Sequence, residues 1–197
     1  MCIRDSCNTI TVLGPETLKK LHKFELVGMS KGAKLVLAAS PKKNIAVFAT
    51  EFTISTGAHA AAIAELDARA KVTGIPCPKF VPLIEGEKFD SPEVTEAITE
   101  YASVAKGAGA DTVILSCAHF PFLREKIQEI LGSAVTVIDP AEQTTKDAQF
   151  KLIEEGLLKL EGKGSTTICF TGGIAAGERL AKFIMPDIEA TFKQVTL

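Results

Sequence analysis

Residues 112–131, TVILSCAHFPFLREKIQEIL, are the stretch that most clearly determines the fold. Residues 112–116 form a short aliphatic run, typical of a strand that is buried on both faces of a parallel sheet. Residues 122–131 have helical spacing and are followed by Gly132, a common residue at the end of a helix. Cys117 lies in the turn between them. The stretch therefore predicts a strand–turn–helix unit with a thiol at the carboxyl end of the strand.

The alternation of strands and helices continues on both sides of this unit. Apolar runs predict further strands at residues 45–50, 80–83, 135–138 and 166–171. Helical patterns lie at residues 15–24, 57–71, 91–106, 141–160 and 177–184. Such alternation is typical of doubly wound α/β proteins with parallel sheets. Residues 1–6, MCIRDS, fit no element, and we interpret them as a non-native scar.

Composition narrows the classes of protein and partner. A chain of 197 residues with 46% hydrophobic and 23% charged residues has the balance of a soluble globular protein. The formal net charge of −2 gives no reason to expect nucleic acid or an anionic membrane as a partner. No apolar run approaches the ~20 residues of a membrane-spanning helix, and no secretory signal pattern precedes the first motif. We expect a cytoplasmic protein.

The cysteines and histidines do not cluster as metal ligands, so the sequence predicts no metal site. The odd count of five cysteines argues against a disulfide framework. We expect Cys77 and Cys169 in the core, and His22 and His59 at the surface.

Two cysteines are candidates for chemistry because each directly precedes a predicted helix. A helix N-terminus lowers the pKa of a thiol, so Cys117 is expected to ionise readily, and His119 can share its proton. Cys7 begins CNTITVLGPETLKKL, where Asn8 and Thr9 add hydrogen-bonding side chains. Two such turns suggest two similar modules that face one cleft. One thiolate would remove a proton from carbon while the opposite thiol delivers one.

Several segments resemble the glutamate racemases of the Asp/Glu racemase superfamily. The run ILSCAHFPFLREKIQEIL is similar to their second catalytic motif, and CNT to the first. The other similar segments are IAVFATEFTISTGAH, CPKFVPLIEGE and CFTGGIAAGERLAKFI. The resemblance implies two pseudo-symmetric doubly wound α/β domains, formed by residues 1–31 with 141–197 and by residues 32–140. It also implies cofactor-independent conversion of L-glutamate to D-glutamate for peptidoglycan, in a homodimer.

The same resemblance assigns roles to individual residues. It implies that Cys7 and Cys117 are the acid/base pair, and that His119 assists Cys117 with Glu85 beside it. The implied substrate contacts are Asn8, Thr9, Ala118, His119 and either Thr50 or Thr53, between which the sequence does not decide.

The family has a longer segment before its first cysteine, so we expect the first domain to be incomplete. Asp5–Ser6 repeats the dipeptide of that segment but abuts Cys7, and we assign it no role. Three other functions stay open. They are a racemase of aspartate or another small acid, a Cys/His nucleophile that forms a covalent adduct, and an inactive relative that binds a small carboxylate.

Overall fold

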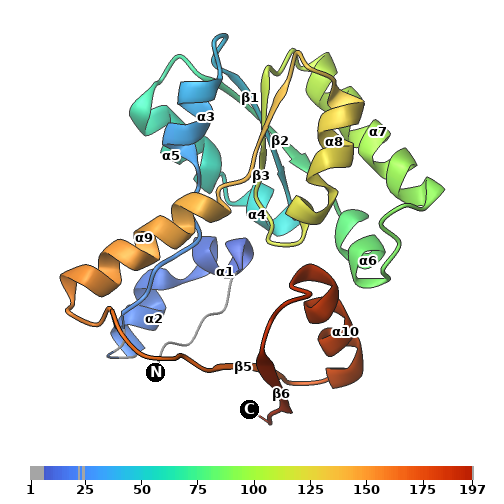
Figure 1. Ribbon diagram of the computed structural model, residues 1–197. Helices are drawn as coiled ribbons and strands as arrows, with labels where there is room; N and C mark the ends of the chain where they lie inside the picture. Colours follow the sequence, from blue (N-terminus) through green and yellow to red (C-terminus); the bar gives the residue numbers. More distant parts are fainter. Residues whose placement is uncertain (1–6, 22, 24, 197) are drawn as a thin grey trace. The chain divides into compact units, whose positions relative to one another are not determined.

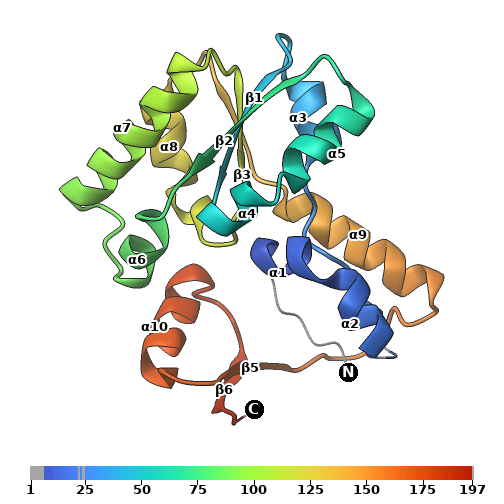
Figure 2. The same cartoon turned by 180° about the vertical axis from the view of Figure 1, so that it is seen from behind.

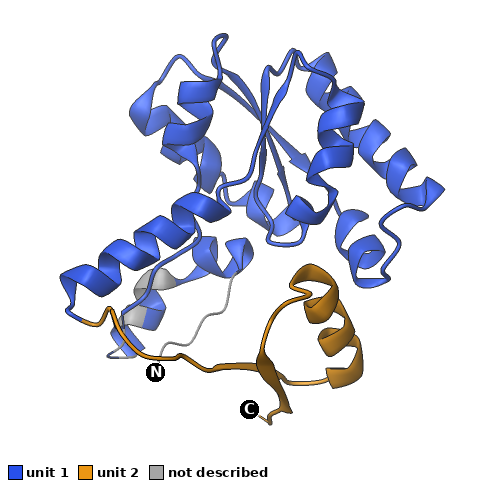
Figure 3. Cartoon of the chain, in the orientation of Figure 1, with its two compact units in different colours: residues 1–156 blue, residues 157–197 orange. Residues whose placement is uncertain are grey.

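The computed structural model describes residues 7–21, 23 and 25–196; the predicted scar at residues 1–6 and His22 lie outside them. The chain forms two compact units, one up to Gly156 and one from Leu157 onward (Figure 3). The first unit contains both Cys7 and Cys117. The α/β class with parallel sheets is confirmed. The division into residues 1–31 with 141–197 and residues 32–140 stays a prediction.

The first unit is built on a four-stranded sheet in the order β2-β1-β3-β4, and every neighbouring pair is parallel (Figure 1). Its strands are β1 (Asn44–Ala49), β2 (Lys71–Pro76), β3 (Thr112–Leu115) and β4 (Thr136–Ile138). In the central pair, Ile45 lies opposite Thr112 and Phe48 opposite Leu115. Because all strands run the same way, the turns that follow them gather at one edge of the sheet.

Along the chain, helices lie before the first strand, between the strands and after the last strand of this sheet. Those before β1 are α1 (Asn8–Leu13), α2 (Pro15–Leu21) and α3 (Ala33–Ala39). Those between β1 and β3 are α4 (Glu51–Ser55), α5 (Ala58–Leu66), α6 (Phe80–Glu85) and α7 (Pro92–Gly107). The 3₁₀-helix η1 (Phe120–Leu123) leads into α8 (Arg124–Leu131), and α9 (Ala141–Glu154) follows β4. Ser91 caps α7, since its hydroxyl accepts the Val94 N–H at 3.4 Å.

Both faces of the sheet are buried, because side chains of successive strand residues point to opposite faces. On β1, Ala46 and Phe48 belong to a core with α6, α7 and α8, whereas Ile45 and Val47 belong to a second core with α3 and α5. Figure 2 shows α3 and α5 on one side of the strands and α7 and α8 on the other. This two-sided burial explains why β1 and β3 read as continuous apolar runs.

The strand predicted at residues 80–83 is wrong, because this segment forms the helix α6. Phe80 and Ile84, one helical turn apart, are both fully buried in the core. A short apolar run does not distinguish a strand from the buried face of a helix. Here Phe80 and Ile84 are four residues apart, which places both on the same buried helix face.

The helix predicted at residues 57–71 is too long. It ends at Leu66, and Lys71–Pro76 form the edge strand β2. Three of its six residues are exposed, and it contains Gly74, where a Cβ atom would lie 2.7 Å from Ile54 Cγ2. The glycine lets α4 approach the strand closely. Because it has no side chain, it also interrupts the apolar pattern from which a strand is predicted. The helix predicted at residues 141–160 also ends early, at Glu154.

The second unit is a strand–helix–strand motif with a parallel pair. It consists of β5 (Thr166–Phe170), α10 (Ile174–Ile184) and β6 (Ala190–Gln194). β5 confirms the strand predicted at residues 166–171, whereas β6 lacked a strong apolar signal. Cys169, predicted to be buried, is exposed on β5. Across the described parts of both units, no helix is long and apolar enough to cross a membrane.

His59 is buried on α5, although the sequence pattern favoured the surface. Its side chain is 4% exposed, and neither ring nitrogen has a hydrogen-bond partner among the described residues. Burial, with a smaller effect of the Lys31 charge, lowers the pKa of His59 from 6.5 to about 4. The neutral ring is therefore the form that fits the core.

We predict that His59 makes the fold sensitive to acid. Its folded-state pKa lies below the unfolded value, so the unfolded chain binds the proton first. Above about pH 6.5, neutral His59 makes its full contribution to the free energy of unfolding. This contribution falls as the pH drops toward 4, by about 3 kcal/mol in total. Urea unfolding at several pH values should show this loss, and His59→Phe should flatten it. An unchanged pH profile in His59→Phe would contradict the assignment.

Candidate functional site

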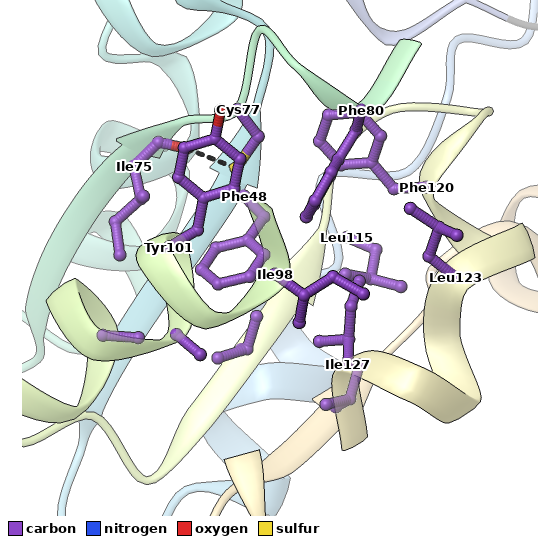
Figure 4. Packing of buried hydrophobic residues seen from close by; sticks show 14 of the residues in the cluster. Phe48, Ile75, Cys77, Phe80, Ile98, Tyr101, Leu115, Phe120, Leu123 and Ile127 are labelled. Atoms are coloured by element: carbon purple, nitrogen blue, oxygen red, sulfur yellow. Dashed lines mark hydrogen bonds between the residues drawn. The ribbon is translucent and has the colours of Figure 1, made fainter. Parts of the chain in front are cut away.

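Cys117 lies in the turn between β3 and η1, and aromatic packing holds this turn. The Phe120 N–H donates to the Cys117 carbonyl at 3.0 Å. The Phe120 ring is fully buried and meets Phe80 edge to face, with centroids 5.0 Å apart (Figure 4). Leu123 follows from the same short helix into the core. The buried side chains of Phe120 and Leu123 therefore hold the turn, and with it the thiol of Cys117, in place.

Two consecutive side-chain contacts connect this thiol to the surface. Cys117 Sγ lies 3.8 Å from His119 Nδ1, and His119 Nε2 lies 3.1 Å from Glu85 Oε1. When Nε2 carries the proton and donates to Glu85, Nδ1 is left as an acceptor that faces the thiol. Glu85 is the last residue of α6, and its side chain is 60% exposed. The arrangement can exchange a proton between the thiol and solvent through the imidazole.

The pKa of Cys117 is raised, which corrects the expectation of a readily ionised thiol. Burial is the main cause; the backbone N–H groups of His119 and Phe120 act in the opposite direction, and the nearby Cys7 raises the pKa further. The side chain is only 9% exposed. Loss of hydration therefore outweighs the helix-end effect, and the resting form is the neutral thiol.

Cys7 caps the first helix of the same unit. Its Sγ accepts the Ile10 N–H at 3.5 Å, and its carbonyl accepts the Thr11 hydroxyl at 2.9 Å. The Thr11 Oγ1 atom in turn accepts the Met29 N–H at 2.9 Å. The turn is thus tied to the segment that leads into α3.

Three threonine hydroxyls join the Cys7 turn to the turn after β1. Thr9 Oγ1 lies 3.1 Å from Thr50 Oγ1 and 3.2 Å from Thr53 Oγ1, and the latter two are 3.0 Å apart. Thr53 is fully buried and Thr50 is half-buried at the N-cap of α4. The structure therefore brings both candidate threonines to Thr9. Which of them contacts a ligand stays open.

A cavity of about 240 Å³ lies beside these turns. Three of the predicted site residues, Asn8, Cys117 and Ala118, line it. Its remaining lining residues are Met29, Leu115, Pro121, Asp139, Pro140, Ala141, Thr144 and Thr145. The volume is below the ~300–1,000 Å³ of sites for drug-sized ligands and suits a small molecule. A shallower hollow of about 480 Å³ around Gln128 contains none of the predicted site residues.

Asp139, Thr144 and Thr145 are cavity residues that the sequence interpretation missed. They follow β4, which pairs with β3, so they reach the same edge of the sheet as Cys117. The rule that ligands bind beyond the carboxyl ends of parallel strands already pointed to this turn. Among the residues that the structure describes, no group of three or more His, Cys, Asp or Glu side chains is placed to hold a metal ion.

The burial of the cysteines predicts an order of alkylation. Exposed Cys169 should react with iodoacetamide first, Cys117 slowly and buried Cys77 last. The rate at Cys117 should increase up to and beyond pH 9, because its pKa is raised above the usual ~8.5. Peptide mass spectrometry over time at pH 7 and pH 9 measures each site. Fast labelling of Cys117 at pH 7 would contradict the neutral thiol.

The threonine cluster predicts a stability difference between two variants. Thr9→Val removes the hydroxyl that reaches Thr50 and Thr53, whereas Thr9→Ser keeps it. The free energy of unfolding of Thr9→Val should be lower than that of Thr9→Ser by about 1 kcal/mol. Equal stabilities in urea titrations would show that the cluster does not hold α1 to α4.

The chain is similar in sequence to a known protein family. The profile of the Asp/Glu/hydantoin racemase family matches residues 5–148. A glutamate racemase of Lysinibacillus sphaericus is 35% identical over 154 residues, which cover 78% of this chain and 58% of that protein. One from Lactobacillus acidophilus is 30% identical over 192 residues, or 96% of this chain and 72% of that protein. The chain thus spans little more than half of some curated relatives.

Solved structures show the same fold. The glutamate racemase isoform RacE1 of Bacillus anthracis matches with a TM-score of 0.88 and 26% identity, over 97% of this chain and 72% of that one. The Francisella tularensis enzyme, solved with D-glutamate, has a TM-score of 0.84 at 24% identity and supports the fold alone. The family profile matches most of this chain, and the fold is the same as in solved members. The chain therefore belongs to the Asp/Glu/hydantoin racemase family.

Proposed function

We propose that this chain carries the two-thiol site of a glutamate racemase, which interconverts L- and D-glutamate without a cofactor. The observation that supports it most is the placement of two cysteines at helix-leading turns of one unit. Cys117 and Asn8, the neighbour of Cys7, line one small cavity. The similar glutamate racemases point to glutamate as the substrate.

The reaction needs one proton acceptor and one proton donor on opposite faces of the α-carbon. In one direction the Cys7 thiolate takes the α-hydrogen as a proton, and the electron pair stays on the α-carbon. The neutral Cys117 thiol then gives its proton to the other face, and Cys117 is left as the thiolate. The reverse reaction starts from that state. No electron is gained or lost, so the cycle needs no redox partner.

His119 and Glu85 serve Cys117 in this proposal. A buried thiolate is costly, and an imidazole at 3.8 Å can lower that cost by sharing the proton. Glu85 orients the ring through Nε2 and connects it to solvent. The substrate carboxylates would accept hydrogen bonds from the Asn8 amide and from the backbone N–H of Ala118. The product would supply D-glutamate for peptidoglycan in the cytoplasm, and the assembly would be a homodimer.

One alternative has a specific observation in its favour. Cys117, His119 and Glu85 form a thiol–imidazole–carboxylate series, which is also the arrangement of a cysteine nucleophile with its base and orienting acid. Such an enzyme would form a covalent adduct on Cys117 and would not need Cys7. Intact-mass analysis after incubation with small acids therefore separates the two functions.

We predict that Cys7→Ser and Cys117→Ser each abolish racemisation, because each removes one of the two acid/base groups. The remaining thiol should still exchange the α-hydrogen of the one enantiomer that faces it. Incubation with L- or D-glutamate in D₂O, followed by NMR and chiral chromatography, measures both events.

Cys169→Ser is the matched control, since this exposed thiol lies in the second unit. It should racemise like the unsubstituted chain. Racemisation that survives in Cys7→Ser would overturn the two-thiol mechanism. The absence of exchange in a folded, unsubstituted sample would overturn the proposed activity.

A further inference from the structure

Glu85 and His119 are 34 residues apart in the chain, so their contact depends on how α6 is held against η1. In the core, Phe80 at the start of α6 packs against Phe120 of η1, and Ile84 is fully buried. These contacts anchor the buried side of the helix. Glu85 is the last residue of α6, and its side chain is 60% exposed. Because helix ends fray, the exposed end needs contacts of its own.

The residues after Glu85 fold back on the last turn of α6 and close it. The Lys88 N–H donates to the Leu83 carbonyl at 3.0 Å. The Glu87 N–H donates to the Ile84 carbonyl, also at 3.0 Å. These two bonds form a Schellman motif, in which Glu87 is the left-handed residue, with a φ of 56°. The end of α6 and the residues up to Lys88 therefore form one closed turn, and a contact that holds the next residue also holds Glu85.

Lys126 of α8 holds the two residues that follow this closed turn. Its Nζ atom donates to the Phe89 carbonyl at 2.9 Å and to Asp90 Oδ1 at 2.7 Å. The Lys126 side chain is 26% exposed, whereas that of Asp90 is 95% exposed. An ion pair so open to water contributes little, so the bond to the carbonyl is the more important of the two. The Phe89 ring also packs against Phe122 of η1, with centroids 6.4 Å apart.

These contacts close a ring that contains both partners of the Glu85–His119 hydrogen bond. His119 directly precedes η1, and η1 continues into α8 with Lys126. Lys126 holds Phe89, which follows the closed turn at the end of α6. From there Glu85 reaches back to His119 Nε2 at 3.1 Å. When Nε2 carries the proton for this contact, Nδ1 faces Cys117 Sγ as an acceptor.

We propose that Lys126 is a positioning residue, which holds Glu85 against His119 and thereby keeps the imidazole proton on Nε2. This rests on the proposed function, in which the acceptor at Nδ1 serves the Cys117 thiol. Lys126 does not line the cavity, so it acts through Glu85 rather than on a substrate. Its loss should therefore slow proton transfer at Cys117 and leave the binding of substrate unchanged.

Four variants separate this role from a general effect on packing. Lys126→Met keeps the aliphatic side chain and removes the donor, whereas Lys126→Arg keeps a cationic donor. Asp90→Asn removes the charge of the exposed ion pair alone. Lys106→Met is the matched control, because Lys106 Nζ of α7 also donates to a carbonyl, that of Ile130, at 2.7 Å. Lys126 and Ile130 lie toward opposite ends of α8, so the two lysines make the same kind of bond at different ends of one helix.

The tautomer of His119 is the direct measurement, by ¹⁵N NMR of the imidazole rings at pH 8. In the unsubstituted chain the His119 signals should be those of the Nε2–H form, and Lys126→Met should move them toward the average of the two tautomers. Lys126→Arg, Asp90→Asn and Lys106→Met should leave them in place. The His59 signals are an internal control, since α5 lies on the other side of the sheet from α8. Racemisation by Lys126→Met should have a kcat lower by about tenfold and an unchanged KM.

An unchanged His119 spectrum in Lys126→Met, or an equal change in Lys106→Met, would overturn the role of Lys126. A change in Lys126→Arg as large as that in Lys126→Met would also overturn it. If Lys126→Met does not fold, Lys126→Gln, whose amide nitrogen ends one atom short of the ammonium, must give the same shift. If the spectra change as expected but the unsubstituted chain exchanges no α-hydrogen of glutamate in D₂O, the role of Lys126 stands and the proposed racemase activity is overturned.

Discussion

The pairing of β1 with β3 is the interaction on which the rest of the first unit depends. These strands lie in the middle of the sheet and are buried on both faces, so they contribute residues to both cores. The ladder continues past β3, where the Ser116 N–H donates to the Phe48 carbonyl at 2.8 Å. This bond fixes the chain immediately before Cys117. Thr50 follows the neighbouring strand, so the register of one strand pair places two turns of the site side by side.

Burial gives the two thiols different environments. Cys117 is enclosed by the larger core, where loss of hydration keeps it neutral, whereas Cys7 is half-buried at the start of a short helix. The packing of Phe80 against Phe120 also links α6 to η1, and these elements carry Glu85 and His119. The same aromatic contact that secures the fold therefore aligns the proton path from Cys117 to solvent.

The site is assembled from turns rather than from any single element. Residues after β1, β3 and β4 meet the start of α1, and hydrogen bonds from Thr9 to Thr50 and Thr53 hold two of these turns together. A further bond from the Ser30 N–H to Thr144 ties the segment before α3 to α9. Such turns tolerate polar side chains because their backbone is already held by the sheet. The cavity can therefore combine a thiol, an amide and a carboxylate without weakening either core.

The sequence by itself determined the α/β class, the central strands and the turn with Cys117, because two-sided burial leaves a continuous apolar run. It also identified the family through motifs around Cys7, Glu85 and His119. The tertiary structure decided what depends on distant neighbours. β2 at an exposed edge, the helical form of Phe80–Glu85, the burial of His59 and the raised pKa of Cys117 follow from packing between segments far apart in the chain. The cavity position of Asp139 likewise depends on strand pairing, which no local pattern records.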